Sequence, residues 1–248
     1  MESLTHPASP TTQHASAGKV VAIIPTFNEA EAISAVIGAL PRDLICRVIV
    51  VDGGSCDGTT ALARQAGAEV ISVGRGYGRA CLAGAKAAEA DDILVFLDGD
   101  GADDAGAIAA LVAPIRAGRA DFVIASRAQG RLEPGSMAWH QLLAGRLAGI
   151  LTRCLYGVRY TDMCALRAIR CRTLLGLGMR ELTYGWNLEM QMRAARAGLR
   201  VIELPVDYRR RLGGRSKVAG SLPGSVKAGL RIVATFARVA IERPRGRR

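Results

Sequence analysis

The sequence predicts an α/β fold in which a mostly parallel central sheet carries helices on both faces. Short β-branched segments alternate with Ala-rich amphipathic segments from about residue 19 to residue 125, a pattern typical of strand-helix-strand units. With 248 residues, of which 50% are hydrophobic, the chain can bury the core of such a domain. Ligands of these sheets bind beyond the carboxyl ends of the strands, so the residues that follow each strand are the candidates for function.

The first half of the chain supplies the regular part of the alternation. Strands are predicted at 20–24, 47–51, 69–73, 93–97 and 121–125, and helices at about 29–40, 57–66, 77–88 and 105–115. Later in the chain we expect a long helix at 139–156, a segment at 160–169, a helix at 185–197 and a strand at 200–206. A last helix, 222–241, has Lys227, Arg231 and Arg238 on one side and apolar residues on another.

Composition divides the chain into three parts. Residues 1–18 lack any periodicity, and we expect a disordered leader there. Residues 19–220 form the predicted domain, and 221–248 form a basic amphipathic helix and tail. From residue 208 to the end there are twelve Lys or Arg and one acid, Glu242, whereas the residues before are neutral in sum. Such a tail is a candidate contact for phosphate, nucleic acid or an anionic membrane face.

The cysteines and the apolar segments indicate a compartment. The six cysteines form no C-x-x-C pair, so we expect buried, reduced thiols and a cytoplasmic protein. The apolar runs are far shorter than the roughly 20 residues that cross a bilayer. Any membrane contact is therefore expected to be peripheral, at the inner membrane face.

An acidic cluster follows the strand 93–97. It contains Asp98, Asp100, Asp103 and Asp104, and carboxylates this close repel one another unless a cation neutralises them. Hard oxygen ligands suit Mg²⁺ or Mn²⁺ carrying a phosphorylated substrate. We predict Asp98 and Asp100 as the metal ligands. Asp103 and Asp104 are equally well explained as the acidic start of the next helix.

Two other predicted strands also end in polar residues. The first ends in PTFNE and the second in VDGGSCDGT. Asp52 is placed to accept a hydrogen bond from a base or a ribose hydroxyl, and Asp57 to cap the next helix. The segment GRGYG does not match G-x-G-x-x-G, which disfavours a dinucleotide-dehydrogenase site.

Seven motifs in this order resemble the family 2 glycosyltransferases of GT-A fold, in the branch of the dolichol-phosphate mannosyltransferases and polyprenyl-phosphate glucosyltransferases. They are PTFNE (25–29), VDGGSCDGT (51–59), GRGYGRA (74–80), DGD (98–100), ASR (125–127), TDMCALRAIR (161–170) and RLGGRSK (211–217). The resemblance covers residues 19 to about 220. It implies a GT-A fold and transfer of a sugar from a nucleoside diphosphate.

The resemblance also implies roles for individual residues. The residues implied in the nucleotide-sugar pocket are Pro25, Asn28, Glu29, Asp52 and Asp98. Asp98 and Asp100 would hold Mg²⁺ or Mn²⁺ on the diphosphate. The residues implied in phosphate contacts are Arg127, Arg211, Ser216 and Lys217, with Arg127 facing the acceptor. Ala102 stands where relatives often carry a polar residue, so Asp103 or water would complete the metal shell.

Asp162 is the candidate catalytic base. A hydroxyl acceptor would need a carboxylate within hydrogen-bond reach, whereas a lipid phosphate is already anionic near neutral pH. In the second case Asp162 would only orient a sugar hydroxyl or an arginine. A buried ion pair of Asp162 with Arg167 or Arg170 is an equal alternative.

The predicted function is an inverting, metal-dependent transfer of a single hexose from a donor of the GDP-mannose or UDP-glucose type to a polyprenyl phosphate. The chain reads MQMRAA where polymerising synthases carry Q-x-x-R-W, which favours a single transfer. Relatives that use lipid phosphate commonly carry a second phosphate anchor in the stretch that reads WHQLLAGRL here (139–147), and its only polar candidates are His140, Gln141 and Arg146. A soluble or cell-envelope hydroxyl acceptor therefore stays an alternative.

Two questions stay open at this level. The helix 222–241 could lie on an anionic bilayer or pack on the domain. An alternative of another class is a non-catalytic nucleotide or nucleic-acid binding protein. The acidic cluster repels nucleic acid, and no aromatic residues are interleaved with the basic tail, so we expect no nucleic-acid partner.

Overall fold

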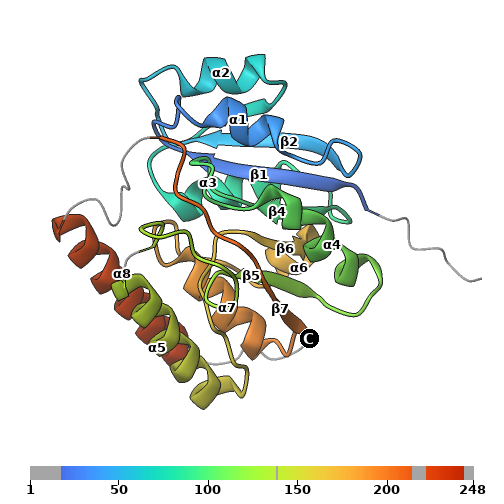
Figure 1. Cartoon of the computed structure of the whole chain (residues 1–248). Helices are drawn as coiled ribbons and strands as arrows, with labels where there is room; N and C mark the ends of the chain where they lie inside the picture. Colours follow the sequence, from blue (N-terminus) through green and yellow to red (C-terminus); the bar gives the residue numbers. More distant parts are fainter. Residues whose placement is uncertain (1–17, 138, 214–221, 243–248) are drawn as a thin grey trace, which may run out of the picture.

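The computed structural model describes residues 18–137, 139–213 and 222–242. Within these residues, seven strands form one sheet in the order β3-β2-β1-β4-β6-β5-β7 (Figure 1). The strands are β1 (Val20–Thr26), β2 (Ile45–Asp52), β3 (Glu69–Ser72), β4 (Ile93–Phe96), β5 (Phe122–Ser126), β6 (Arg167–Arg170) and β7 (Val201–Pro205). All pairs are parallel except those of β6 with β4 and β5.

Helices cover this sheet. They are α1 (Ile33–Gly38), α2 (Thr59–Gln65), α3 (Tyr77–Lys86), the 3-10 helix η1 (Ala105–Ala107), α4 (Ile108–Arg116), α5 (Trp139–Tyr156), α6 (Cys171–Gly176), α7 (Trp186–Arg196) and α8 (Leu222–Ile241). Helix α3 packs on β1 and β2, and α4 packs on β4, β5 and β6. Every residue of β1 is buried, as expected for a central strand covered on both faces. The predicted fold class is confirmed.

Strand β6 is the main departure from the expected alternation. The segment 160–169 was predicted without a direction, and α6 was not predicted. The sequence of β6, RAIR, is not typical of a buried strand, because it places a charged residue, Arg167, at a position that is completely buried. Its guanidinium donates to the main-chain oxygens of Cys164, Ala165 and Asn187. Because β6 runs antiparallel, the residues that precede it, 161–166, reach the carboxyl edge of β4 and β5.

Helix α8 packs on the domain. Its principal contacts are with α7, and Val239 of α8 joins Ala148 of α5 with Leu188 and Met192 of α7 in a small buried cluster. Within the described part of the chain, none of the helices has the length and hydropathy needed to cross a bilayer.

The expectation for the cysteines is confirmed for three of the six. All six are free thiols, but only Cys81, Cys164 and Cys171 are buried. Residues 1–17 of the predicted leader lie outside the described residues, as do Ser216 and Lys217. Gly18, which the leader was expected to include, is described and buried.

Candidate active site

The loops after β1 and β2 are held together by polar contacts. Oδ2 of Asp52 accepts hydrogen bonds from the main-chain N–H groups of Gly54 and Ser55, each at 2.9 Å, and Oδ1 accepts the Ser55 hydroxyl. Ser55 Oγ in turn accepts the N–H of Asn28 at 2.8 Å. Asp52 is only 2% exposed, so in this structure it shapes the turn. A direct contact with a base or ribose stays a prediction.

Asn28 and Asp57 complete this connection. Asn28 has a φ of 52°, which asparagine tolerates better than most residues, and its Oδ1 accepts the N–H of Cys56 at 3.0 Å. Asp57 accepts the N–H groups of Thr59 and Ala30, both at 3.1 Å. The N-cap of α2 is Gly58, so Asp57 lies one residue before the predicted capping position. Its side chain still binds the first residue of α2 and ties it to the loop after β1.

A stacked pair that the sequence reasoning missed lies at the same edge. The guanidinium of Arg75 lies 4.0 Å from the centroid of the Phe27 ring. Phe27 sits inside PTFNE and Arg75 inside GRGYG, so the signal was an aromatic residue and a cation within two motifs already singled out. A flat aromatic and guanidinium surface of this kind suits stacking of a planar group.

The acidic cluster lies at the end of β4. Asp103 accepts the N–H of Asp98 at 2.9 Å, and Asp100 accepts the N–H of Ala102 at 2.9 Å. Asp104 caps η1 by accepting the N–H of Gly106 at 3.1 Å. Asp103 and Asp104 were both candidates for the acidic start of a helix. Asp104 has that role here, whereas the side chain of Asp103 turns back towards Asp98.

This cluster holds more negative charge than its surroundings neutralise. Burial, together with the charges of Asp103 and Asp100, raises the pKa of Asp98 well above its usual value. Burial likewise raises the pKa of Asp103 to about 6. A divalent cation would relieve this repulsion, and carboxylate oxygens are the ligands that Mg²⁺ and Mn²⁺ prefer.

The donor set fits a cation that shares its shell with a substrate. Across the described ranges, no three Asp, Glu, His or Cys side chains converge into a metal site. A cation held by Asp98 and Asp100 would therefore take its other ligands from water and a diphosphate, as Mg²⁺ commonly does. Asp98 and Asp100 have the carboxylate chemistry that this cation requires, although both oxygens of Asp100 accept hydrogen bonds from the protein here, and their role as metal ligands stays a prediction.

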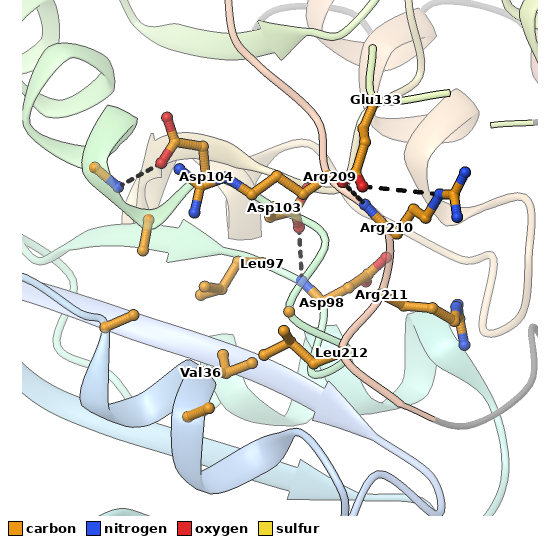
Figure 2. A pocket seen from close by; sticks show the side chains of 15 residues that line it. Val36, Leu97, Asp98, Asp103, Asp104, Glu133, Arg209, Arg210, Arg211 and Leu212 are labelled. Carbon is orange, nitrogen blue, oxygen red and sulfur yellow. Dashed lines mark hydrogen bonds and ion pairs between the residues drawn. The ribbon is translucent and has the colours of Figure 1, made fainter. Parts of the chain in front are cut away.

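A pocket of about 610 Å³ opens beside the acidic cluster, between α1 and the segment that follows β7 (Figure 2). Its lining includes Asp98, Asp103 and Asp104 together with Arg209 and Arg210. The Arg210 side chain is turned towards Glu133 and the carbonyl oxygen of Pro134 (Figure 2). The acidic cluster and this basic segment meet across the pocket, so the site carries charges of both signs.

Arg211 links the two sides of the site. It donates from Nη2 to Asp100 Oδ2 at 2.7 Å. The main chain of residues 209–212 also runs along the acidic loop. The N–H of Leu212 donates to the carbonyl oxygen of Asp100 at 2.9 Å, and the N–H of Arg209 donates to that of Ala102 at 3.1 Å. Within the described residues, Nη1 of Arg211 is buried and has no hydrogen-bond partner, so one donor is available to a ligand.

Arg127 and Asp162 form a buried ion pair at the end of β5. Arg127 donates to Asp162 from Nε at 2.7 Å, from Nη2 at 2.8 Å and from its main-chain N–H at 2.9 Å. Met163 N–H adds a fourth bond at 2.7 Å. Burial alone would raise the pKa of Asp162, but the hydrogen bonds and charge of Arg127 hold that pKa below its usual value. Asp162 is therefore a weak base in this state.

Asp162 forms a buried ion pair, which was one of the two predicted alternatives. Its partner, however, is neither of the two arginines that the sequence suggested. Asp162 pairs with Arg127, whereas Arg167 and Arg170 donate to main-chain oxygens. Arg127 also lies close enough to the acidic cluster to lower the pKa values of Asp98 and Asp103.

The structure places the predicted residues in two neighbouring groups. Asp98, Asp100, Arg127, Asp162 and Arg211 lie around the end of β4. The second group lies at the ends of β1 and β2 and consists of Pro25, Asn28, Glu29 and Asp52. Pro25 is buried inside β1, opposite Val51. The chemistry that the first group supports is binding of a metal-bound anion between carboxylates and arginines.

Comparison with known proteins identifies the relatives of this chain. The family described as glycosyl transferase family 2 matches residues 21–175. The chain is 38% identical over 214 residues to an uncharacterised glycosyltransferase of Mycobacterium tuberculosis, covering 84% of this chain and 94% of that protein. It is 33% identical over 224 residues to the undecaprenyl-phosphate mannosyltransferase of Micrococcus luteus, covering 83% and 90%. It is 30% identical over 221 residues to the polyprenol monophosphomannose synthase of Mycolicibacterium smegmatis, covering 82% of each.

Solved structures show the same architecture. Glucosyl-3-phosphoglycerate synthase from Mycobacterium tuberculosis, in complex with Mn²⁺, UDP-glucose and phosphoglyceric acid, superposes with a TM-score of 0.72 at 22% identity, over 90% of this chain and 80% of that one. At this identity the likeness establishes the fold. Since the family match spans more than half of the chain and these relatives span most of it, the chain belongs to glycosyl transferase family 2 and is a glycosyltransferase of GT-A fold.

Proposed function

We propose that this glycosyltransferase moves a single hexose from a nucleoside diphosphate sugar to a polyprenyl phosphate, with inversion at the anomeric carbon. Two relatives at 33% and 30% identity are named for mannose transfer to undecaprenyl phosphate and for synthesis of polyprenol monophosphomannose. A structural neighbour binds Mn²⁺ and UDP-glucose. The observation that carries the proposal is the acidic pair Asp98 and Asp100 facing Arg127 and Arg211.

The donor is held at its diphosphate in this proposal. Asp98 and Asp100 would hold Mg²⁺ or Mn²⁺, and the cation would supply charge stabilisation of the departing nucleoside diphosphate. Arg211 contributes its free Nη1 donor to a phosphate oxygen. Phe27 and Arg75 offer the stacking surface for the base, next to Asn28.

The acceptor is held at its phosphate. Arg127, oriented by Asp162, faces the phosphate, whose oxygen attacks the anomeric carbon from the side opposite the leaving group. The bond from that carbon to the diphosphate breaks, and the diphosphate leaves with the electron pair. No proton has to be removed from an ionised phosphate, so the low basicity of Asp162 favours this acceptor over a hydroxyl. Asp162 is then a positioning residue.

Membership of the family sets the non-catalytic alternative aside. A soluble or cell-envelope hydroxyl acceptor is the remaining alternative, and it requires another base in the site. The acceptor also places the proposed reaction at the cytoplasmic face of the membrane, where the enzyme would be peripheral.

A transfer assay tests the proposal. Full-length protein is incubated with GDP-mannose or UDP-glucose, Mg²⁺ or Mn²⁺, and polyprenyl phosphate in detergent, and labelled sugar in the lipid phase is measured. Asp98→Asn and Asp100→Asn should reduce transfer at least about a hundredfold, because the charge stabilisation of the leaving group is lost.

Asp121→Asn is the matched control. Asp121 is an acid immediately before β5 that pairs with Arg200 and does not line the pocket, so this variant should retain most of the activity. Wild-type turnover in Asp98→Asn and Asp100→Asn, or transfer to hydroxyl acceptors in preference to lipid phosphate, would contradict the proposal.

A further inference from the structure

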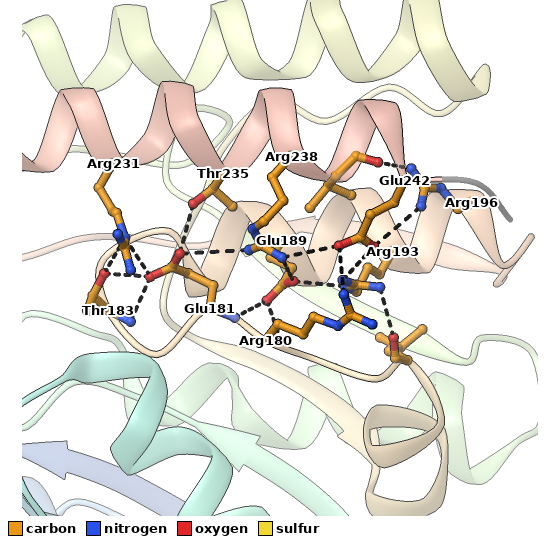
Figure 3. A network of polar contacts seen from close by, with 12 residues as sticks. Arg180, Glu181, Thr183, Glu189, Arg193, Arg196, Arg231, Thr235, Arg238 and Glu242 are labelled. Carbon is orange, nitrogen blue, oxygen red and sulfur yellow. Dashed lines mark hydrogen bonds and ion pairs between the residues drawn. The ribbon is translucent and has the colours of Figure 1, made fainter. Parts of the chain in front are cut away.

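Helix α8 faces the domain with two arginines and a threonine beside the apolar Val239, whereas an amphipathic helix usually turns its charged residues to solvent. Arg231 donates to Glu181 at 3.1 Å, and Arg238 donates to Glu189 at 3.0 Å (Figure 3). The hydroxyl of Thr235 donates to Glu181 at 3.0 Å. Glu181 and Glu189 are both buried. Arg231 and Arg238, which the sequence offered to an anionic bilayer, are thus paired with acids of the domain.

The apolar side of α8 consequently faces outward. Leu230 and Val233 are each 67% exposed, and Ile241 is 81% exposed. Ala234 and Ala237, which lie on the same side of the helix, are exposed as well. Nothing in the described chain covers this stripe.

Helix α5 presents a second stripe of the same kind. Ala148 and Thr152 are buried, while five large apolar residues among the described side chains of α5 are exposed. The exposed residues are Leu143, Leu147, Ile150, Leu151 and Leu155. Helices α5 and α8 lie side by side in both views (Figures 1 and 3), and both contribute to the buried cluster on α7.

We refer to the eight large apolar residues that α5 and α8 expose as the outer face. They are Leu143, Leu147, Ile150, Leu151, Leu155, Leu230, Val233 and Ile241. The other large apolar residues exposed in the described part of the chain are Leu175, Tyr184 and Leu212. Exposed apolar side chains gathered in this way mark a contact surface.

Charged residues lie beside the outer face. The segment 134–161, which contains α5, has no acid and three arginines, Arg146, Arg153 and Arg159, all exposed. On α8, Arg231 and Arg238 face the domain and do not contribute to this charge. Glu242 is also turned towards the domain, where it pairs with Arg193 at 2.8 Å. The outer face therefore has exposed arginines of the segment 134–161 beside it and no exposed acid from that segment.

We propose that the outer face, formed by α5 and α8 together, rests on an anionic lipid bilayer, with its leucines, isoleucines and Val233 in the headgroup and acyl boundary. Apolar residues beside basic ones match such a surface in both chemistry and charge. A second copy of the chain would bring two basic surfaces together, which opposes a symmetric dimer through this face. The inference deepens the proposed function, on which it rests for the lipid acceptor that the bilayer would supply.

Vesicle sedimentation tests the inference without any donor or acceptor. The full chain is mixed with vesicles of phosphatidylcholine, alone or with phosphatidylglycerol, and the bound fraction is measured. The double variant Leu147→Glu with Val233→Glu should lower the partition coefficient by about tenfold or more, because both side chains leave the acyl boundary. Arg146→Gln and Arg153→Gln should each weaken binding to the phosphatidylglycerol vesicles by about fivefold.

Leu175→Glu is the control, because Leu175 is an exposed leucine on α6 away from the outer face; its binding should equal that of the wild type. All variants change exposed residues, and circular dichroism confirms that they fold. Equal binding by the double variant and the wild type would overturn the inference. So would a dimer in light scattering that the double variant converts to a monomer without any vesicle binding.

The assay separates this inference from the proposed function. Vesicle binding that depends on the outer face, in an enzyme that transfers no sugar to polyprenyl phosphate, would contradict the proposed function and support the inference. Transfer to detergent-dispersed polyprenyl phosphate by a protein that binds no vesicle would support the proposed function and contradict the inference.

Discussion

Asp162 shows how its surroundings decide what a carboxylate can do. It is 3% exposed and accepts four hydrogen bonds, three of them from Arg127. The sequence identified Asp162 as functional or ion-paired, but the partner was not predictable because Arg127 lies 35 residues earlier and other arginines are nearer in sequence. By contrast, Asp98 and Asp100 could be predicted, since their place directly after a strand fixes them at the sheet edge.

The pair of Asp162 and Arg127 predicts strong energetic coupling. Asp162→Asn leaves a mostly buried arginine without its counter-charge, so the free energy of unfolding should fall by about 3 kcal/mol. Arg127→Gln should have a similar effect, and the double variant should lose less than the sum of the two. Urea denaturation of all four proteins measures this coupling, and strictly additive losses would contradict the ion pair.

The same pair predicts a pH dependence. Because the pKa of Asp162 is lower in the folded protein than in the unfolded chain, its stabilisation is complete above the unfolded value of about 4. The stabilisation is lost as the pH falls through the folded pKa. The coupling measured at pH 7 should therefore persist down to about pH 4 and shrink below it. If the coupling energy disappeared between pH 7 and pH 5, a group other than Asp162 would be titrating, and the prediction would be wrong.

At the scale of elements, the strongly periodic segments were predictable and the segments held by buried charge were not. Strands β1, β2 and β4 are apolar runs, and they form where the sequence predicts them. Strand β6 escaped because Arg167 is buried on main-chain oxygens. Helix α8 was predicted, but its orientation was not, because the acids that hold its arginines come from residues 181 and 189, far away in sequence.

The attachment of α8 to α7 predicts a large effect at Glu189. This fully buried carboxylate accepts the main-chain N–H groups of Arg180 and Glu181 and the side chains of Arg193 and Arg238. Glu189→Gln should lower the free energy of unfolding by about 3 kcal/mol, since two arginines lose a buried partner. Thermal and urea denaturation measure the change.

The surface pair Arg47 and Glu69 is the matched control. Arg47 Nη2 and Glu69 Oε2 lie 2.9 Å apart, but the side chain of Glu69 is 55% exposed. Glu69→Gln should change the free energy of unfolding by less than about 1 kcal/mol. Equal losses in Glu189→Gln and Glu69→Gln would show that α8 is held by packing rather than by these ion pairs.

At the scale of the whole molecule, the net positive charge lies in the last 41 residues of the sequence, which include, near their start, residues that line the pocket. Residues 1–207 are neutral in sum, and the segment after β7 supplies Arg209, Arg210 and Arg211 to the pocket before the chain continues to α8. This arrangement brings a basic segment against the acidic cluster at the sheet edge. It suits a ligand that carries phosphate groups and a cation together.

The central claim is that Asp98 and Asp100 hold a divalent cation on the diphosphate of the donor. Isothermal titration of GDP and UDP into the full-length protein, with and without Mn²⁺, tests it most directly. For the nucleotide that binds, we predict that Mn²⁺ strengthens binding by about tenfold or more in the wild type and has no effect in the Asp98→Asn, Asp100→Asn double variant. The same strengthening by Mn²⁺ in both proteins would contradict the account.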